Sequence, residues 1–242
     1  MQTVHVETES KRYTVIIDEG LRHQVGSLVK EMIPSISSVL IVTDSNVAPL
    51  YLEDVKESFD QSTTVFDYVI KSGEGSKSFT VYEQVLTKAL ESRLDRKSVV
   101  VALGGGVVGD LAGFVAATYM RGIRFVQVPT TLLAHDSSVG GKVAINHNLG
   151  KNMVGCFHQP EAVLYDTQCL TSLPLDEWRS GFAEVIKHGF IRDNNFLETL
   201  RNHWHSFDSI PTQQINEMLA KSIAVKADVV SEDEKEIGIR LI

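Results

Sequence analysis

The chain has 242 residues, of which 43% are hydrophobic and 22% are charged, and its formal net charge is −8. This length allows two domains, and the composition is typical of a globular protein with an ordinary core. The negative charge argues against a broad nucleic-acid-binding surface, and no apolar run reaches the length of a membrane span. The first residues lack the apolar region of a signal peptide, and Cys156 and Cys169 lack metal-site spacing, so reduced thiols in a cytoplasmic protein are expected.

Strands and helices are predicted to alternate through the first part of the chain. In chain order, hydrophobic patterning favours a strand at 13–17, a helix at 21–33, strands at 39–43 and 64–70, a helix at 78–92, a strand at 98–103, a helix at 107–119 and a strand at 125–128. Such alternation predicts a mainly parallel sheet with helices on both faces.

The pattern changes near residue 172. Pro174 and the acids after it are typical of a helix start, and beyond it the sequence predicts helices at 175–190, 193–205 and 211–231 with no good strand. The expected fold class is therefore α/β. A Rossmann-like parallel-sheet domain would occupy residues 1–172, and the first part of an all-α domain would occupy residues 173–242.

Residues 98–110 are the most informative stretch, because they read as a buried strand, a glycine turn and a helix start. Gly104, Gly106 and Gly109 fit the G-x-G-x-x-G pattern in the strand-to-helix context that a dinucleotide site requires. A backbone without side chains can approach a pyrophosphate, which then faces the free N–H groups of the following helix. Close packing of strand and helix would explain the same glycines.

An ordinary Rossmann site also has an acid about twenty residues downstream to bind the adenine ribose, and this chain has none there. Asp44 ends an earlier apolar strand, and ligands of open α/β sheets bind at the carboxyl ends of strands. Asp44 is therefore a candidate to hold the ribose, while a role in capping the next helix explains it equally well.

Two polar loops, 129–142 and 146–155, mix glycine with hydroxyl, amide and charged residues, which suits a phosphate-rich ligand. Lys142, Lys151 and Arg121 form a candidate cationic group, although each alone could be a solvated surface residue. Glu184 and His188 are four residues apart in a predicted helix. They could reach one divalent metal, or lie on an exposed helix face.

Together, the segments 104–110, 129–142, 150–155 and 181–189 resemble the 3-dehydroquinate synthase family of the sugar-phosphate cyclases, and the resemblance runs along essentially the whole chain. The run 136–142, DSSVGGK, followed by GKN at 150–152, is far more specific than the glycine turn alone. His135 stands where many members carry two residues, which we interpret as a short local deletion.

The resemblance implies three groups of site residues. NAD would be bound by Asp44, Asn46, Glu74, Lys77, Gly105, Gly106, Val107, Val108, Gly109, Asp110, Thr130, Thr131, Lys142, Lys151, Cys169, Leu170, Thr171 and Ser172. The catalytic residues that hold the substrate would be Lys142, Asp136, Asn152, Lys187, Arg121, Lys226 and Arg240. Glu184 matches a ligand of the family's metal, Zn²⁺ or Co²⁺, whereas His188 does not.

The family converts 3-deoxy-D-arabino-heptulosonate 7-phosphate to 3-dehydroquinate and phosphate in the shikimate route to aromatic amino acids. NAD⁺ takes a hydride from a ring alcohol and returns it after phosphate has left, and the metal acts as a Lewis acid on that alcohol. The family's two metal-binding histidines lie beyond residue 242. The resemblance therefore implies a C-terminally truncated chain that binds NAD but lacks synthase activity, and a homodimer.

Three other interpretations are open. The chain could be a related sugar-phosphate cyclase similar to 2-deoxy-scyllo-inosose synthase, or a metal-dependent polyol dehydrogenase that releases NADH. It could also be a non-catalytic NAD-binding module. The lysines between residues 140 and 152 argue against the last, because a nucleotide sensor needs no cations for a substrate. Neither a nucleic acid nor a membrane is expected as a partner.

Overall fold

The computed structural model describes residues 1–203 and 210–238. Seven strands form one sheet in the order β1-β2-β9-β6-β5-β3-β4. They are Gln2–Glu7 (β1), Arg12–Asp18 (β2), Ser38–Asp44 (β3), Thr64–Ile70 (β4), Val99–Gly104 (β5), Arg124–Pro129 (β6) and Ala162–Asp166 (β9). Neighbouring strands are parallel except for β1 and β2. A separate antiparallel hairpin pairs Lys142–His147 (β7) with Gly150–Phe157 (β8).

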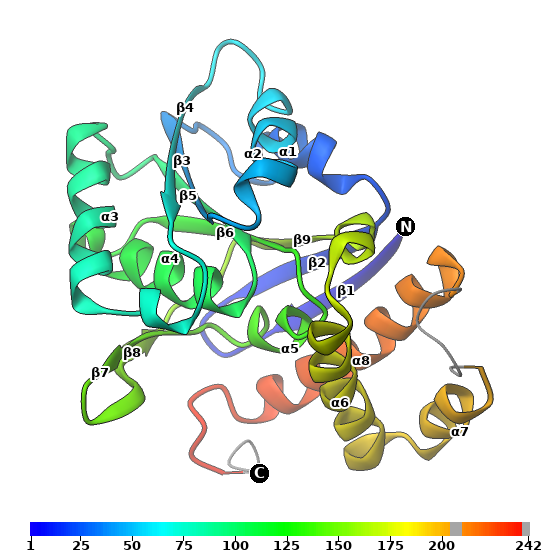
Figure 1. Ribbon diagram of the computed structural model, residues 1–242. Coiled ribbons are helices and arrows are strands. Elements are labelled where there is room, and N and C mark those ends of the chain that lie inside the picture. The colour runs from blue at the N-terminus through cyan, green and yellow to red at the C-terminus, as the bar shows by residue number, and fades with distance from the viewer. Residues whose placement is uncertain (204–209, 239–242) are drawn as a thin grey trace.

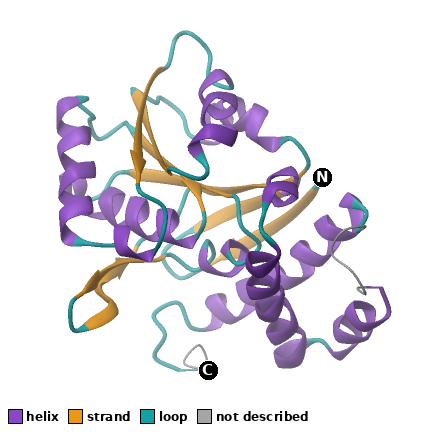
Figure 2. Cartoon of the chain, in the orientation of Figure 1, coloured by secondary structure: helices purple, strands orange, loops and turns teal. Residues whose placement is uncertain are grey.

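Helices cover both faces of this sheet (Figures 1 and 2). One face carries α1 (Val25–Met32) and α2 (Ala48–Glu57), and the other carries α3 (Phe79–Glu91) and α4 (Gly106–Thr118). Helix α8 (Thr212–Glu232) packs against β1 and β2, α6 (Leu175–Arg192) packs against α8, and α7 (Asn194–His203) packs against α6. The short helices are η1 (Leu21–Gln24), η2 (Glu74–Ser76), η3 (Tyr119–Arg121), α5 (Ala134–Ser137) and η4 (Thr167–Ser172). The predicted fold class, a Rossmann-like α/β part followed by helices, is confirmed.

Strand β3 shows why helices pack on both faces. Val39 and Ile41 belong to the core under α1 and α2, whereas Leu40 and Val42 belong to the core under α3 and α4, and all four are fully buried. Successive strand residues point to opposite faces of a sheet, so an unbroken apolar run fits a strand that is buried on both.

The structure also contains elements that the sequence did not predict. These are β1, α2, the hairpin β7–β8 and β9. The expected polar loops 129–142 and 146–155 form α5 and most of the hairpin, where glycine and polar residues interrupt the apolar pattern of the strands. The expected boundary near residue 172 falls at the end of η4, and the division into two domains stays a prediction.

The chain reverses its direction across the sheet between β3 and β5. The connection after β3 leads to β4 on one side, whereas the connection after β5 leads to β6 on the other. In open α/β sheets a crevice forms at such a point, outside the carboxyl ends of the strands. Thr43 pairs with Leu103, so Asp44 and the glycine turn after β5 lie next to each other at this crevice.

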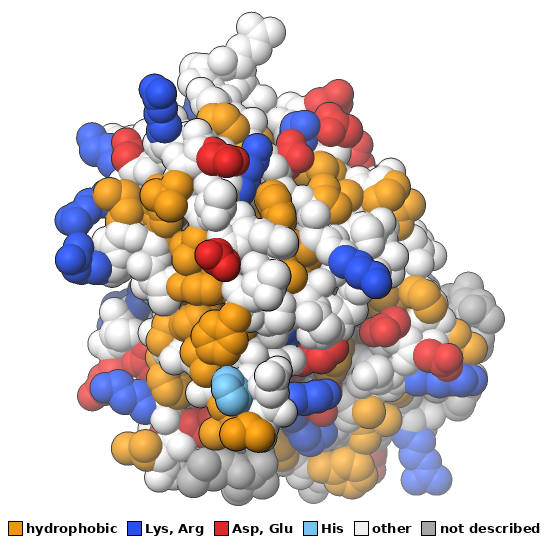
Figure 3. Space-filling view, turned by 60° about the vertical axis from the view of Figure 1, so that its left-hand side comes forward, with side chains coloured by type: hydrophobic (Ala, Val, Ile, Leu, Met, Phe, Trp, Pro, Cys, Tyr) orange, Lys and Arg blue, Asp and Glu red, His pale blue; other side chains and the backbone are white. Residues whose placement is uncertain are grey.

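Figure 3 looks onto the side that carries α3 and the hairpin, where apolar side chains reach the surface among charged ones. Phe79 of α3 is 50% exposed, and Leu149 and Met153 of the hairpin are 92% and 74% exposed. The tip of the hairpin is therefore an exposed apolar surface. No described helix combines the length and apolar character needed to cross a bilayer.

The first turn of α3 depends on Ser78, whose hydroxyl accepts a hydrogen bond from the N–H of Val81 at 3.3 Å. Ser78→Ala is expected to lower the free energy of unfolding by about 1 kcal/mol, because this N–H loses its partner. Urea denaturation followed by circular dichroism measures the change. Ser92→Ala, at the other end of the same helix, should change the free energy by less than about 0.5 kcal/mol. Equal losses in the two variants would contradict the capping role.

Candidate active site

A cleft of about 630 Å³ opens at the carboxyl ends of β3 and β5, and we call it the cofactor cleft. Most of the predicted NAD-binding residues line it: Asp44, Asn46, Glu74, Lys77, Gly105, Gly106, Val107, Asp110, Thr130, Thr131, Lys151 and Ser172. Five of the other predicted NAD-binding residues do not line the cleft: Thr171 is exposed, and the buried ones are Val108, Gly109, Cys169 and Leu170.

Helix α4 begins at the cofactor cleft with an uncapped first turn. Gly105 precedes the helix and offers no side-chain cap, so the first N–H groups are free to bind an anion. A Cβ atom on Gly106 would lie 3.0 Å from the Ser137 hydroxyl oxygen, whereas a Cβ on Gly109 would lie 2.5 Å from Gln127 Oε1. Contacts within the protein therefore leave no space for a side chain at Gly109 and little space for one at Gly106.

Asp44 fits both roles that the sequence left open. Its Oδ1 accepts hydrogen bonds from the backbone N–H groups of Asn46 at 2.8 Å and Val47 at 3.1 Å, which caps the turn before α2. The same residue lines the cofactor cleft beside Asn46. A carboxylate at this strand end is suited to accept hydrogen bonds from ribose hydroxyls.

A second cavity of about 590 Å³, which we call the catalytic cavity, adjoins the cofactor cleft. Asp110, Ser137 and Asn152 line both spaces. Four of the predicted catalytic residues line the catalytic cavity: Lys142, Asp136, Asn152 and Lys226. Two lysines, a carboxylate and an amide are suited to bind a phosphorylated polyhydroxy acid.

Lys77 connects the two spaces. Its side chain is only 4% exposed, and its Nζ lies 2.6 Å from Asp110 Oδ2 and 2.5 Å from Asn152 Oδ1. Burial raises the pKa of Asp110, although the positive charge of Lys77 acts in the opposite direction. Lys77 therefore ties a carboxylate at the start of α4 to an amide on the hairpin.

Asp136 lies where α5, α6 and α8 meet. Its Oδ1 is 3.0 Å from His188 Nε2 and 3.0 Å from Lys226 Nζ. Burial opposes ionisation, but the hydrogen bond with His188 and the charge of Lys226 outweigh it and hold the pKa of Asp136 well below its usual range. Asp136 is therefore an ionised carboxylate at the wall of the catalytic cavity.

Asp136, Glu184 and His188 offer possible metal ligands that all lie within 4.8 Å of one another. The nitrogens of His188 are 2.7 Å from the Ser222 hydroxyl and 3.0 Å from Asp136, so both already have partners. Glu184 is partly exposed and forms an ion pair with Lys187. The predicted metal ligand Glu184 thus lies in a cluster of possible ligands, and its role in metal binding stays a prediction.

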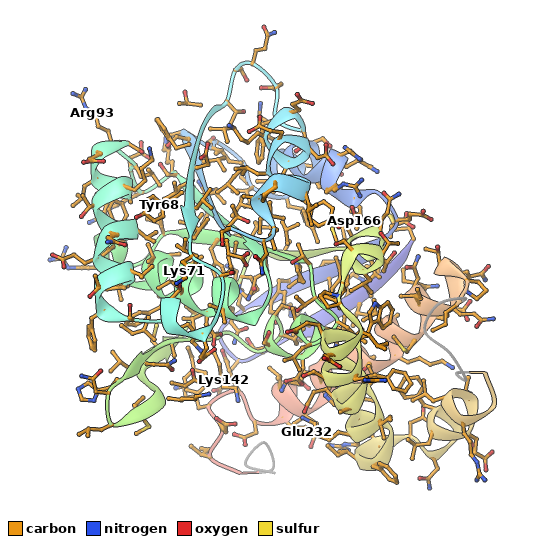
Figure 4. The ribbon with its side chains drawn as sticks, viewed as in Figure 1. Tyr68, Lys71, Arg93, Lys142, Asp166 and Glu232 are labelled. Carbon is orange, nitrogen blue, oxygen red and sulfur yellow. The ribbon has the colours of Figure 1, made fainter. Side chains whose placement is uncertain are left out.

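Two further predicted catalytic residues, Lys187 and Arg121, lie outside the two spaces. Lys187 is on α6, and Arg121 ends η3 with a φ of 70°, beyond the far end of α4. Arg240 lies outside the described residues. Figure 4 labels Lys142, which lies between the hairpin and the segment after α8, where its Nζ is 2.9 Å from Glu236 Oε1.

Sequence reasoning missed several residues at these spaces. Ser137 lines both of them, and Glu236 lines the catalytic cavity. Ser137 is adjacent to Asp136 in the most specific motif, so the motif itself could have indicated it. Nothing local in the sequence indicates Glu236, because its position depends on how the segment after α8 packs.

The buried ring of His135 makes the stability of the fold depend on pH. Burial lowers the pKa of His135 to about 4, against a partial opposing effect of its hydrogen bond to Leu132. Between its unfolded value of about 6.5 and this folded value, the unfolded chain binds a proton that the folded chain does not. The free energy of unfolding should therefore fall by about 3 kcal/mol as pH drops through this window.

Urea denaturation at several pH values measures how the free energy of unfolding changes with pH in the wild type and in His135→Gln. Between these two pKa values, the change should be smaller in His135→Gln. His5→Gln, at an exposed histidine, is the matched control and should keep the wild-type slope. An unchanged slope in His135→Gln would assign the effect to another group.

The fold and the site define an α/β protein of the sugar-phosphate cyclase type. A crystal structure of 2-deoxy-scyllo-inosose synthase complexed with carbaglucose-6-phosphate, NAD⁺ and Co²⁺ is 26% identical with a TM-score of 0.86, and the match covers 99% of this chain and 65% of that chain. Residues 67–180 match the 3-dehydroquinate synthase N-terminal family and residues 181–242 match the 3-dehydroquinate synthase C-terminal family. The chain belongs to the 3-dehydroquinate synthase family.

Curated relatives support this membership. The 3-dehydroquinate synthases of Shouchella clausii and Halalkalibacterium halodurans are each 56% identical to this chain, over 98% and 100% of its length. The chain spans 65% and 66% of the lengths of these two relatives.

Proposed function

We propose that these residues form the cofactor site and much of the substrate site of a 3-dehydroquinate synthase, which converts 3-deoxy-D-arabino-heptulosonate 7-phosphate to 3-dehydroquinate and phosphate in the shikimate route. One observation carries this proposal. The cofactor cleft and the catalytic cavity share Asp110, Ser137 and Asn152, so a dinucleotide and a phosphorylated sugar acid would meet there. The crystal structure of the related cyclase, which contains NAD⁺ and carbaglucose-6-phosphate, supports it.

The lining of the cofactor cleft offers groups suited to the parts of NAD. The free N–H groups of α4 and the nearby Lys151 would bind the pyrophosphate, and Asp44 would accept hydrogen bonds from a ribose. Gly105 and Gly106 carry no side chains, so the backbone at the start of α4 would come close to the phosphates. When bound, NAD supplies a reversible hydride acceptor.

The catalytic cavity would orient the substrate mainly by charge and hydrogen bonding. Lys142 and Lys226 would neutralise the phosphate and the carboxylate of the substrate. Asp136 would accept a hydrogen bond from a substrate hydroxyl, because its low pKa keeps it ionised and makes it a weak base. Asn152 is held in place by Lys77, so its amide is preorganised.

Glu184 would be one ligand of the Zn²⁺ or Co²⁺ that the family uses, and such a metal supplies Lewis-acid chemistry when bound. A catalytic zinc site takes three protein ligands. Among the described residues, His188 and Asp136 are already engaged with other partners. We therefore propose that the 242 residues bind NAD⁺ but are not sufficient for turnover.

The proposed reaction is tested with NAD⁺, Zn²⁺ and the seven-carbon substrate, while phosphate and NADH are measured separately. A chimera that adds the remaining segment of the Halalkalibacterium halodurans relative is expected to release phosphate without net NADH. The 242-residue chain alone should bind NAD⁺ and release phosphate at less than about 1% of the rate of the chimera, a loss of at least about 3 kcal/mol of transition-state stabilisation.

Each alternative function gives a different result in this assay. Net formation of NADH would indicate a polyol dehydrogenase, and a preference for glucose 6-phosphate would indicate a cyclase similar to 2-deoxy-scyllo-inosose synthase. Full activity of the 242 residues would disprove their proposed insufficiency. We also propose that the protein is cytoplasmic and forms a homodimer, and light scattering of the purified protein tests the dimer.

A further inference from the structure

A continuous line of hydrogen bonds runs through the interior from α5 to α8 and α6, and it ends at the catalytic cavity. His135 Nδ1 lies 2.5 Å from the Leu132 carbonyl oxygen, and His135 Nε2 lies 3.0 Å from the Ser222 hydroxyl. The same hydroxyl lies 2.7 Å from His188 Nδ1, and His188 Nε2 lies 3.0 Å from Asp136 Oδ1. His135, His188 and Ser222 are at most 2% exposed.

The first partner in this line fixes the direction of every later hydrogen bond. A carbonyl oxygen can only accept, so His135 Nδ1 carries a proton and donates it to Leu132. Because burial keeps His135 neutral at pH 7, its Nε2 has a lone pair and accepts from the Ser222 hydroxyl. The only hydroxyl proton of Ser222 is therefore donated to His135 and is not available to His188.

The Ser222 oxygen must therefore accept from its second partner, so His188 Nδ1 also carries a proton. The other nitrogen of His188 faces Asp136, whose ion pair with Lys226 at 3.0 Å keeps the carboxylate ionised and without a proton to give, so Nε2 donates as well. We infer that His188 carries a proton on both ring nitrogens and acts as a positioning residue for Asp136, fixing which carboxylate oxygen faces the catalytic cavity.

The groups around His188 are consistent with a cation. From α5 it faces Asp136 and the edge of the His135 ring, at a centroid separation of 5.4 Å. From α8 it faces Ser222, and Lys226 shares Asp136 with it. On its own helix, Glu184 places a carboxylate oxygen within 4.8 Å of its ring nitrogen. Two carboxylates thus balance the positive charges of His188 and Lys226.

This arrangement determines how Asp136 can act. His188 and Lys226 both bind Oδ1, so Oδ2 is the oxygen that we assign to a ligand hydroxyl in the catalytic cavity. A carboxylate with two positive partners on one oxygen is an anchor for a hydroxyl group and a poor acceptor of a full proton. The assignment of that hydroxyl to a sugar acid rests on the proposed function, whereas the protonation of His188 does not.

Nuclear magnetic resonance of the full chain labelled with ¹⁵N-histidine tests the protonation at neutral pH. His188 is expected to show two protonated nitrogens, and His135 only a protonated Nδ1. His158 provides an internal standard for a proton on the other ring nitrogen than in His135, because its Nε2 lies 2.9 Å from the Ile123 carbonyl oxygen and must donate to it. The His188→Gln spectrum assigns the signal. A bare nitrogen on His188 would overturn the inference whether or not the protein has synthase activity.

Ser222 provides a matched test of the line itself. Ser222→Ala should alter the signals of both His135 and His188, whereas Ser222→Thr, which retains the hydroxyl, should restore the wild-type pattern. Ser231→Ala in the same helix is the control, since that hydroxyl bonds only to the carbonyl of Asp228 at 2.8 Å among the described contacts, and it should leave both signals unchanged. Unaltered signals in Ser222→Ala would show that the ring protons are set by other groups.

The consequence for catalysis is tested in the chimera of the phosphate-release assay. His188→Leu should lower kcat/KM about 100-fold and His188→Gln, which keeps a neutral donor, about 10-fold, while the NAD⁺ dissociation constant stays within about twofold. A parallel loss of NAD⁺ affinity would indicate general unfolding, and equal kcat/KM in the wild type and His188→Leu would disprove the positioning role. If the chimera is inactive altogether, the proposed function fails, and the resonance experiment still decides the protonation of His188.

Discussion

Gly105→Asp is expected to weaken NAD⁺ binding about 1000-fold, which corresponds to about 4 kcal/mol. Gly105 occupies the position before the first turn of α4 and has extended backbone angles, φ −77° and ψ −172°. An aspartate there would accept hydrogen bonds from the free N–H groups and place its negative charge where the pyrophosphate should bind. Aspartate is a favoured residue at this position of a helix, and a Cβ there would lie 3.0 Å from Thr131 Cγ2, so the fold should tolerate the change after a small shift of the Thr131 side chain.

Gly105→Asn separates the two effects of this substitution. Asparagine fills the same space and caps the same N–H groups without adding a charge, so its NAD⁺ affinity should lie between those of the wild type and Gly105→Asp. Isothermal titration with NAD⁺ measures all three proteins, and thermal denaturation confirms that each is folded. Wild-type affinity in Gly105→Asp would disprove the assignment of the pyrophosphate to the start of α4.

Lys77→Met should lower the free energy of unfolding by about 4 kcal/mol. The methionine fills a similar volume, but it leaves Asp110 without its ion-pair partner and Asn152 without its donor. Because burial already opposes the ionised form of Asp110, loss of the lysine should raise the pKa of this carboxyl further. Urea denaturation measures the stability, and NAD⁺ titration reports whether the cofactor cleft is disturbed as well.

Two variants control this prediction. Lys71→Met makes the same change at an exposed lysine, labelled in Figure 4, and should alter the free energy of unfolding by less than about 0.5 kcal/mol. In the double variant with Asp110→Asn, the uncompensated charge is gone, so about 2 kcal/mol of stability should return. A double variant no more stable than Lys77→Met would show that the loss comes from packing.

The parts of the fold that the sequence predicted are those with strong local patterns. Strands β3 and β5 are apolar runs buried on both faces, α3 has clear helical spacing, and α4 is an apolar segment that directly follows the glycine turn. Strand β8 is different. It carries glycine, lysine and asparagine, and most of its residues are exposed, so only its pairing with β7 defines it.

The site divides in the same way. The glycine turn and Asp44 could be placed from the sequence because both follow buried strands, and the carboxyl ends of parallel strands lie together. The partners of His188 could not be predicted from the sequence. Its position four residues from Glu184 suggested a metal pair, whereas its actual partners come from α5 and α8, which lie 52 and 34 residues away in the chain. Contacts between distant segments leave no local pattern in the sequence.

Asp110, Ser137 and Asn152 belong to the walls of two adjoining spaces, and Lys77 holds the first and last of them together. A molecule that fills one space therefore alters the surroundings of the other, and the two equilibria are thermodynamically linked. If the bound nucleotide changes the affinity for the second molecule by some factor, the bound second molecule changes the affinity for the nucleotide by the same factor. We expect a NAD⁺ titration in the presence of the seven-carbon substrate to show tighter binding than a titration without it.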